Sequence, residues 1–195
     1  MSELFATLPE ADLAPLHERL VAAAGAAGLL DVAYRTLPTP VGELLLAATP
    51  EGLVKVAFTG SEPVDAVLER LAAEVSPRVL HAPARLDQVA AQLDEYFAGR
   101  RTRFEVPVDL RLAHGFRRAV LAALPTIGYG ATASYAAVAA MAGSPRAVRA
   151  VGSACATNPV PVVVPCHRVV RSDGGLGGYA GGLDAKRALL ALEAA

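Results

Sequence analysis

The chain has 195 residues, of which 53% are apolar and 19% are charged, and its formal net charge is −1. This composition suits a packed core and is atypical of a disordered protein, and no run of 18 or more uncharged apolar residues predicts a membrane span. The two cysteines suggest neither a disulfide scaffold nor a zinc site of the usual spacing, and the acidic start argues against a secretory signal, so we expect a cytoplasmic protein with reduced cysteines.

Charge is distributed unevenly along the chain. Residues 1–110 contain 9 basic and 16 acidic residues, whereas residues 111–195 contain 9 basic and 3 acidic residues. A basic second half favours a polyanionic partner. The alternative is that the charges only keep the protein in solution.

The first predicted element is an amphipathic helix over residues 11–27. Leu13, Leu16 and Leu20 share one face of this helix, and Gly28 is well placed to end it. We expect the apolar face to pack on the domain that follows. A membrane-surface role is not favoured, because the polar face is not basic.

Residues 31–60 predict a meander of three strands, with a type I turn at Thr49–Gly52. Two helices are predicted next, over residues 64–75 and about 87–97, from apolar side chains that repeat at helical spacing. Strands followed by helices favour an α+β domain. Residues 100–114 are predicted to be a connector.

A helix-turn-helix pattern follows a further predicted helix at residues 116–124. Ser134 can cap the first helix of the pair, and Pro145 suits the first turn of the second. The second helix would carry Arg146 and Arg149 toward DNA, among small side chains that allow a close approach. An alanine-rich helical hairpin without a DNA-binding role explains the same spacing.

The glycine-rich stretch Gly175–Ala180 fits the spacing of a dinucleotide-binding loop. We predict no nucleotide site there, because Gly181 and Gly182 are not expected to open a helix and no βαβ unit surrounds them. A loop that approaches other parts of the chain closely explains the glycines better.

The stretch Pro159–Val170 carries the strongest chemical signal. Its three consecutive valines predict a short buried strand bounded by prolines, and Cys166 and His167 follow directly. A thiol at the end of a rigid element suits a nucleophile, and Arg168 and Arg171 are expected to lower its pKa. The alternative is an inert structural cysteine, since free cysteines commonly pack as small hydrophobes.

Several motifs of the second half occur in a recognisable order. They are Ser134-Tyr135, Ala147–Gly152, Asn158–Val169, Gly177–Leu183 and Lys186. With this order and spacing, the segment from about Phe116 to Glu193 resembles the O6-alkylguanine-DNA alkyltransferases, also called methylated-DNA–protein-cysteine methyltransferases. Residues 93–110 also look like the domain boundary of that family.

The resemblance implies an α+β fold, in which a small RNase-H-like α/β domain precedes a helical, winged-helix-like domain that bears the helix-turn-helix. We expect a helical extension at residues 1–30, the RNase-H-like domain at 31–104, and the DNA-binding and alkyl-acceptor domain at 105–195. The first 30 residues match nothing in the family pattern.

The resemblance also implies an activity. It is DNA repair by stoichiometric transfer of an alkyl group from O6-alkylguanine, and from O4-alkylthymine, in flipped-out nucleotides of double-stranded DNA. One molecule then repairs one lesion. The resemblance implies no cofactor and no metal, and we expect a monomer whose cooperativity on DNA is left open.

Each matching residue takes a role from the resemblance. Cys166 is the alkyl acceptor, and His167 and Glu193 complete a Cys–His–Glu relay. Asn158 braces the active-site loop, and Tyr135 helps to rotate the nucleotide and to protonate the leaving guanine. The remaining matches are Arg149, which fills the vacated base stack, Ser144 and Ser172 near the phosphates, and Pro161, Tyr179 and Ala180 around the alkyl group.

Some positions depart from the family pattern. Gly128 stands where proline is usual, Leu121 where tryptophan is usual, and Ala131 where glutamate is common. We expect looser packing at Gly128 and Leu121. The zinc-binding cluster of the damage-sensing regulators is missing, and Cys166 argues against the non-enzymatic relatives that have tryptophan at this position.

Two other classes of function are left open by the residues. A DNA-binding sensor or regulator without transfer would explain the helix-turn-helix, and it predicts salt-sensitive binding with no change in protein mass. A cysteine hydrolase would explain the Cys, His and Glu residues, and it predicts many turnovers without DNA.

Overall fold

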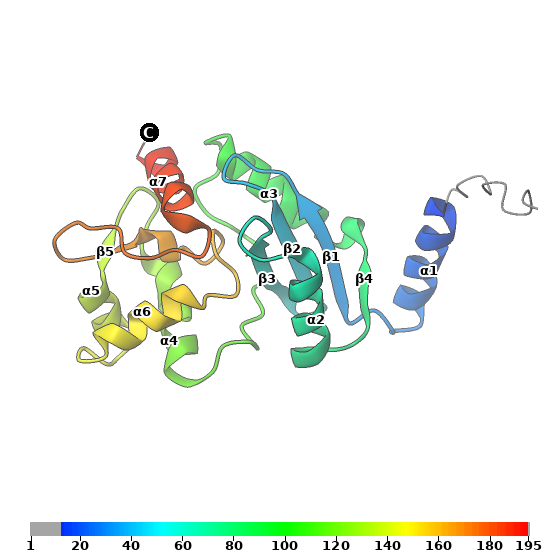
Figure 1. Cartoon of the computed structure of the whole chain (residues 1–195), viewed down its shortest axis with the longest axis horizontal. Helices are drawn as coiled ribbons and strands as arrows, with labels where there is room; N and C mark the ends of the chain where they lie inside the picture. Colours follow the sequence, from blue (N-terminus) through cyan, green and yellow to red (C-terminus); the bar gives the residue numbers. More distant parts are fainter. Residues whose placement is uncertain (1–12, 195) are drawn as a thin grey trace, which may run out of the picture.

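The computed structural model describes residues 13–194, which form a sheet half and a helical half (Figure 1). The first twelve residues of the predicted N-terminal extension lie outside the described residues. The division into halves agrees with the expected α+β class. The exact domain boundaries stay predictions.

The sheet half contains one four-stranded sheet in the order β3-β2-β1-β4. Its strands are β1 (Val32–Leu37), β2 (Leu44–Thr49), β3 (Gly52–Phe58) and β4 (Val79–His81). The first three form the predicted antiparallel meander, whereas β4 pairs parallel to β1. β4 is too short for an alternating pattern to predict it.

The sheet is covered by α2 (Val64–Glu74) and α3 (Asp87–Phe97), and a 3-10 turn, η1 (Pro83–Leu86), precedes α3. Both helices confirm the predictions. α2 buries Val67 against one face of the sheet, and α3 buries Tyr96 in the core that both halves share.

The N-terminal helix α1 (Ala14–Ala26) forms as predicted, but its apolar face does not pack on the domain that follows. Leu16 and Leu20 are 58% and 52% exposed. α1 lies beside the edge strand β4 (Figure 1), where His17 Nε2 is 2.5 Å from the carbonyl oxygen of His81. The packing prediction is wrong for these leucines, and the helical side chains buried in the cluster with β1, β2 and β3 are Val67 and Leu71 of α2.

The helical half contains four helices, two 3-10 turns and a two-stranded parallel ribbon within residues 115–194. They are α4 (Gly115–Ala123), η2 (Leu124–Thr126), β5 (Ala133–Ser134), α5 (Tyr135–Met141), α6 (Val148–Ala156), η3 (Cys166–Arg168), β6 (Val169–Val170) and α7 (Gly182–Glu193). Ser134 caps α5 as predicted, because its hydroxyl accepts a hydrogen bond from the Ala137 amide at 3.1 Å.

The second helix of the helix-turn-helix begins later than predicted. α6 starts at Val148, so Arg146 lies in the preceding turn and not in the helix. The Ala147 amide donates to the Ser144 carbonyl at 2.9 Å, which closes a turn around Pro145 before the helix can begin.

The prediction that Gly182 opens no helix is also wrong, because α7 begins there. Gly182 has a φ of 83°, a left-handed conformation that lets the loop turn into the helix. Asp184 in the first turn complements the helix dipole. The strand before these glycines, β6, has two residues and pairs parallel with β5.

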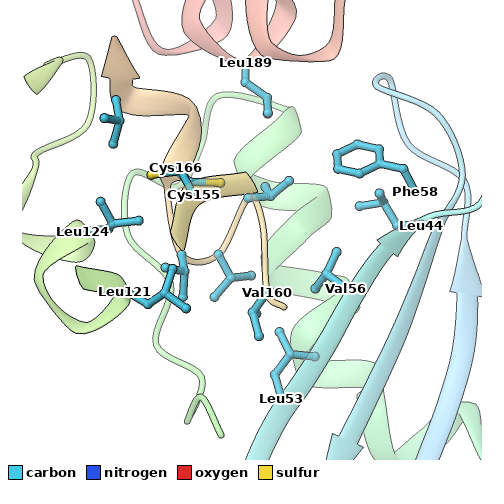
Figure 2. Packing of buried hydrophobic residues seen from close by; sticks show 14 of the residues in the cluster. Leu44, Leu53, Val56, Phe58, Leu121, Leu124, Cys155, Val160, Cys166 and Leu189 are labelled. Atoms are coloured by element: carbon cyan, nitrogen blue, oxygen red, sulfur yellow. The ribbon is translucent and has the colours of Figure 1, made fainter. Parts of the chain in front are cut away.

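One apolar core joins the two halves (Figure 2). Val56 of β3 lies close to Val160 of the loop after α6, and Leu121 of α4 and Leu189 of α7 belong to the same cluster. The Val56 amide donates to the Pro159 carbonyl at 2.8 Å. The loop after α6 is therefore anchored to the sheet.

Leu121 and Gly128, the two departures where looser packing is expected, line one cavity of about 640 Å³.

Between residues 13 and 194, no helix has the length and apolar character needed to cross a membrane. Over the same residues, no three His, Cys, Asp or Glu side chains gather as a metal site would require.

Candidate active site

The segment between α6 and η3 is a turn-rich loop rather than the predicted strand. The Val164 amide donates to the Val160 carbonyl at 2.9 Å. The Asn158 side chain accepts from the Val160 amide at 3.0 Å and donates to the Val164 carbonyl at 2.9 Å. This side chain takes the place of a strand partner, and Val162 has a φ of 72°, a strained conformation for a β-branched residue.

Cys166 begins η3 directly after this loop and is only 2% exposed. Burial raises the pKa of the Cys166 thiol to about 11, although a hydrogen bond from Asn158 Nδ2 at 3.1 Å and the charge of Lys186 act to lower it. The expectation that Arg168 and Arg171 lower this pKa is wrong. Desolvation of the thiol dominates, and the Arg168 guanidinium is bound to the Glu193 carboxylate. The free protein therefore holds a neutral thiol, which needs a base.

Glu193, in the last turn of α7, is a buried carboxylate with five hydrogen bonds. Oε1 accepts from the Tyr96 hydroxyl at 2.6 Å, from His167 Nε2 at 2.9 Å and from an Arg168 terminal nitrogen at 2.8 Å. Oε2 accepts from Arg168 Nε at 2.8 Å and from the Gly130 amide at 3.3 Å. Burial alone would raise the pKa of Glu193, but these donors outweigh it and lower the pKa to about 2.

His167 follows Cys166 in η3, bonds to this carboxylate and is fully buried. Burial lowers the pKa of His167, although Glu193 acts to raise it, so the imidazole is neutral at neutral pH. The carboxylate can only accept, so Nε2 carries the hydrogen and Nδ1 keeps a lone pair. Nδ1 has no hydrogen-bond partner among residues 13–194. It can therefore take up a proton.

The loop between β6 and α7 is held over this group by Lys186 and Phe58. The buried Lys186 ammonium donates to the Val169 carbonyl at 2.7 Å and also to the Leu176 carbonyl. Tyr179 meets the Phe58 ring edge-on at 5.7 Å and the His167 ring at 6.2 Å. Tyr179 therefore lies beside His167, and its place in the alkyl pocket stays a prediction.

The other two expected pocket residues differ in exposure. Pro161 is buried in the loop after α6, whereas Ala180 is exposed. Ala180, Asn158 and Phe58 line one cavity of about 400 Å³ between the two halves. The pocket role of these residues stays a prediction.

Tyr135 is the first residue of α5, and its hydroxyl packs against Gly177 of the loop between β6 and α7. Burial raises the pKa of Tyr135, and the Cys155 and Cys166 thiols add to this rise. Tyr135 therefore keeps its proton at neutral pH and can act as a donor.

The residues expected at the DNA lie on the surface of the helical half. Arg146, Arg149 and Ser172 are exposed, and Ser144 is half-buried. Neither guanidinium pairs with a carboxylate within the described part of the chain. Both charges are therefore available to a polyanion.

The sequence does not predict that Tyr96 and Gly130 bind Glu193, and it predicts an effect of Arg168 on Cys166 instead of its bond to Glu193. Tyr96 is 97 positions from Glu193 in the chain, so no local motif could join them. The available signals were a tyrosine on the apolar face of a predicted helix and an arginine directly after the Cys-His pair. Neither signal indicates which carboxylate is bound.

Both halves of the chain match models of known protein families. Residues 32–110 match the model described as 6-O-methylguanine DNA methyltransferase, ribonuclease-like domain, and residues 115–195 match the DNA binding domain of the same name. A methylated-DNA–protein-cysteine methyltransferase of Mycolicibacterium paratuberculosis is 43% identical over 164 residues, which are 83% of this chain and 92% of that protein. This chain belongs to the 6-O-methylguanine DNA methyltransferase family.

Other members of the 6-O-methylguanine DNA methyltransferase family agree. The Homo sapiens methylated-DNA–protein-cysteine methyltransferase is 41% identical over 81% of this chain and 78% of its own length. The crystal structure of the Mycobacterium tuberculosis O6-methylguanine methyltransferase aligns with a TM-score of 0.73 at 40% identity, over 84% of this chain and 93% of that one. A structure of the Mycobacterium tuberculosis protein in complex with DNA aligns with a TM-score of 0.72 at 39% identity, over 83% and 92%.

Proposed function

We propose that this protein repairs DNA by transferring the alkyl group of O6-alkylguanine to Cys166, once per molecule. Family membership supports this reaction, and a relative's structure in complex with DNA supports the partner. The observation that carries the proposal is the buried thiol of Cys166, which adjoins a neutral His167 that is bound at 2.9 Å to an ionised Glu193.

Extrusion of the damaged nucleotide is part of the proposal, because Cys166 is 2% exposed and cannot meet a base inside a duplex. Unpairing and unstacking a base cost roughly a few kcal/mol. Exposed arginines that grip phosphates offset this cost, and Arg149 fills the gap that the base leaves.

The proposed reaction is a displacement at carbon by sulfur. The Cys166 proton passes to His167 Nδ1, through a water molecule, and Glu193 stabilises the imidazolium that forms. The sulfur then forms a bond to the alkyl carbon, while the bond from that carbon to O6 breaks. The leaving guanine takes a proton from Tyr135, since it leaves poorly as an anion. Asn158 assists by donating to the sulfur as its charge develops.

A thioether is the product, and no neighbouring group is set to hydrolyse it. This chemistry explains why one molecule should repair one lesion. Transfer from O4-alkylthymine, a monomeric state, cooperativity on DNA and a cytoplasmic location stay predictions. The roles of Ser144, Ser172, Pro161 and Ala180 stay predictions as well.

The test uses a duplex with one O6-methylguanine and peptide mass spectrometry. We expect the Cys166 peptide to gain one methyl group and the duplex to regain guanine. Cys166→Ser should abolish transfer, whereas Cys155→Ser, at the other buried cysteine, should retain it. Transfer that persists in Cys166→Ser would refute the proposal. DNA binding without a mass change would indicate a sensor, and repeated turnover of an ester without DNA would indicate a hydrolase.

A further inference from the structure

Tyr96 belongs to α3 in the sheet half, yet its hydroxyl donates to Glu193 Oε1 in the helical half at 2.6 Å. The side chain is fully buried. Its ring packs against three other aromatic rings, with centroid distances of 5.3 Å to Phe97, 5.1 Å to Phe104 and 6.1 Å to Tyr129. The position of the hydroxyl is therefore fixed by the core and not by the carboxylate alone.

The two carboxylate oxygens of Glu193 bind different sets of donors. Oε2 is held by Arg168 and by the Gly130 amide, whereas Oε1 is shared by Tyr96, Arg168 and His167. Tyr96 and His167 therefore compete for the charge on one oxygen. A donor that withdraws charge from Oε1 weakens the attraction of that oxygen for an imidazolium.

We propose that Tyr96 is a positioning residue for alkyl transfer, whose hydroxyl fixes Glu193 Oε1 toward His167 and limits how strongly that oxygen attracts the imidazole proton. The proposal rests on the proposed function for its kinetic consequence. The sheet half thereby contributes directly to the proton relay of the helical half, instead of serving only as a support.

Tyr96 acts as a donor and does not itself move a proton. Burial raises the pKa of Tyr96, and the bond to Glu193 raises it further, so the hydroxyl stays protonated at neutral pH and below. The charge that it adjusts belongs to Glu193, and the group that responds is His167. The titratable and charged groups that act on His167 or contact it are Glu193 and Lys186 of α7, Arg168 of η3 and Tyr179 of the loop before α7. Tyr96 of α3 shares Glu193 Oε1 with His167.

Removal of one hydroxyl gives a direct test. In Tyr96→Phe the ring stays in the core, but Oε1 loses one donor and its remaining charge acts more strongly on His167. We expect the titration midpoint of His167 to rise by about 0.5 pH unit or more. The free energy of a hydrogen bond to a charged group is larger than the free energy that such a shift represents. The His167 ring signal among the four histidines is assigned by its loss in His167→Gln and followed by NMR.

Tyr129→Phe is the matched control. It removes a hydroxyl from a neighbouring ring of the same aromatic cluster, but that hydroxyl donates at 3.1 Å to the backbone carbonyl of Leu192 and not to the carboxylate. We expect the His167 midpoint of this variant to equal that of the unaltered protein. Urea unfolding checks that both variants are folded.

Single-turnover transfer from an O6-methylguanine duplex, measured against pH, gives the second readout. In Tyr96→Phe the acidic limb of the rate profile should move to higher pH by the same amount as the His167 midpoint. In a Glu193→Gln background, Tyr96→Phe should move neither, because the charge through which it acts is gone.

The proposal fails if Tyr96→Phe leaves the His167 midpoint in place, if Tyr129→Phe shifts it equally, or if the shift persists in the Glu193→Gln background. Absence of any transfer by the unaltered protein would overturn the proposed function. The NMR titration would still decide the link between Tyr96 and His167 in that case.

Discussion

Glu193→Gln is the change that tests the buried relay through stability. The pKa of Glu193 is about 2 in the folded chain against an ordinary value of 4.5. At about 1.4 kcal/mol per pH unit, this difference is worth about 3 kcal/mol of stability. Because the pKa of Glu193 is lower in the folded chain, this stabilisation is fully present at pH values above the ordinary pKa of 4.5. It is lost as the pH falls toward the folded-state pKa of about 2. Between pH 5 and pH 3 the loss comes to about 2 kcal/mol.

The assay is urea unfolding at several pH values from 7 to 3. At pH 7 we expect Glu193→Gln to be destabilised by about 3–5 kcal/mol, because Arg168 is left as a buried charge without its counterion. Between pH 5 and pH 3 the unfolding free energy of Glu193→Gln should also fall less than that of the unaltered protein. The difference between the two falls should be about 2 kcal/mol. Glu105→Gln, at a side chain that is 73% exposed, should leave the slope unchanged. A slope in Glu193→Gln that parallels the unaltered protein would refute the reasoning.

Three further outcomes are expected. Asn158→Ala removes the donor that lies 3.1 Å from the Cys166 sulfur, so the thiol pKa should rise and quench-flow should record transfer that is about 10- to 100-fold slower; an unchanged rate would contradict this role. Gly128→Ala places a Cβ in open space, so thermal unfolding should show a gain of about 0.4–1 kcal/mol. Gly177 has a φ of 65° and a Cβ there would overlap the Tyr135 hydroxyl, so Gly177→Ala should cost about 1–2 kcal/mol in urea unfolding, and a neutral result would show that the loop can move away.

The sequence could predict those features that depend on neighbours in the chain. Alternation and helical spacing identify β1 to β3, α2 and α3, because these patterns arise from burial on one face of a regular element. The order of motifs around Cys166 indicates the family and the nucleophile. The sequence could not predict that the apolar face of α1 stays exposed, since two amphipathic helices show the same spacing and only the folded chain shows that α2 is the one buried against the sheet.

Three properties of the site became visible only in the folded structure. The valine run forms turns, because the Asn158 side chain satisfies the backbone groups that a neighbouring strand would otherwise satisfy. The Cys166 pKa is raised, because desolvation outweighs the nearby positive charges. Tyr96 reaches Glu193, because the packing of two halves brings together residues 97 positions apart. The residue order therefore determined which groups are present, whereas burial and long-range packing determined their charge and their partners.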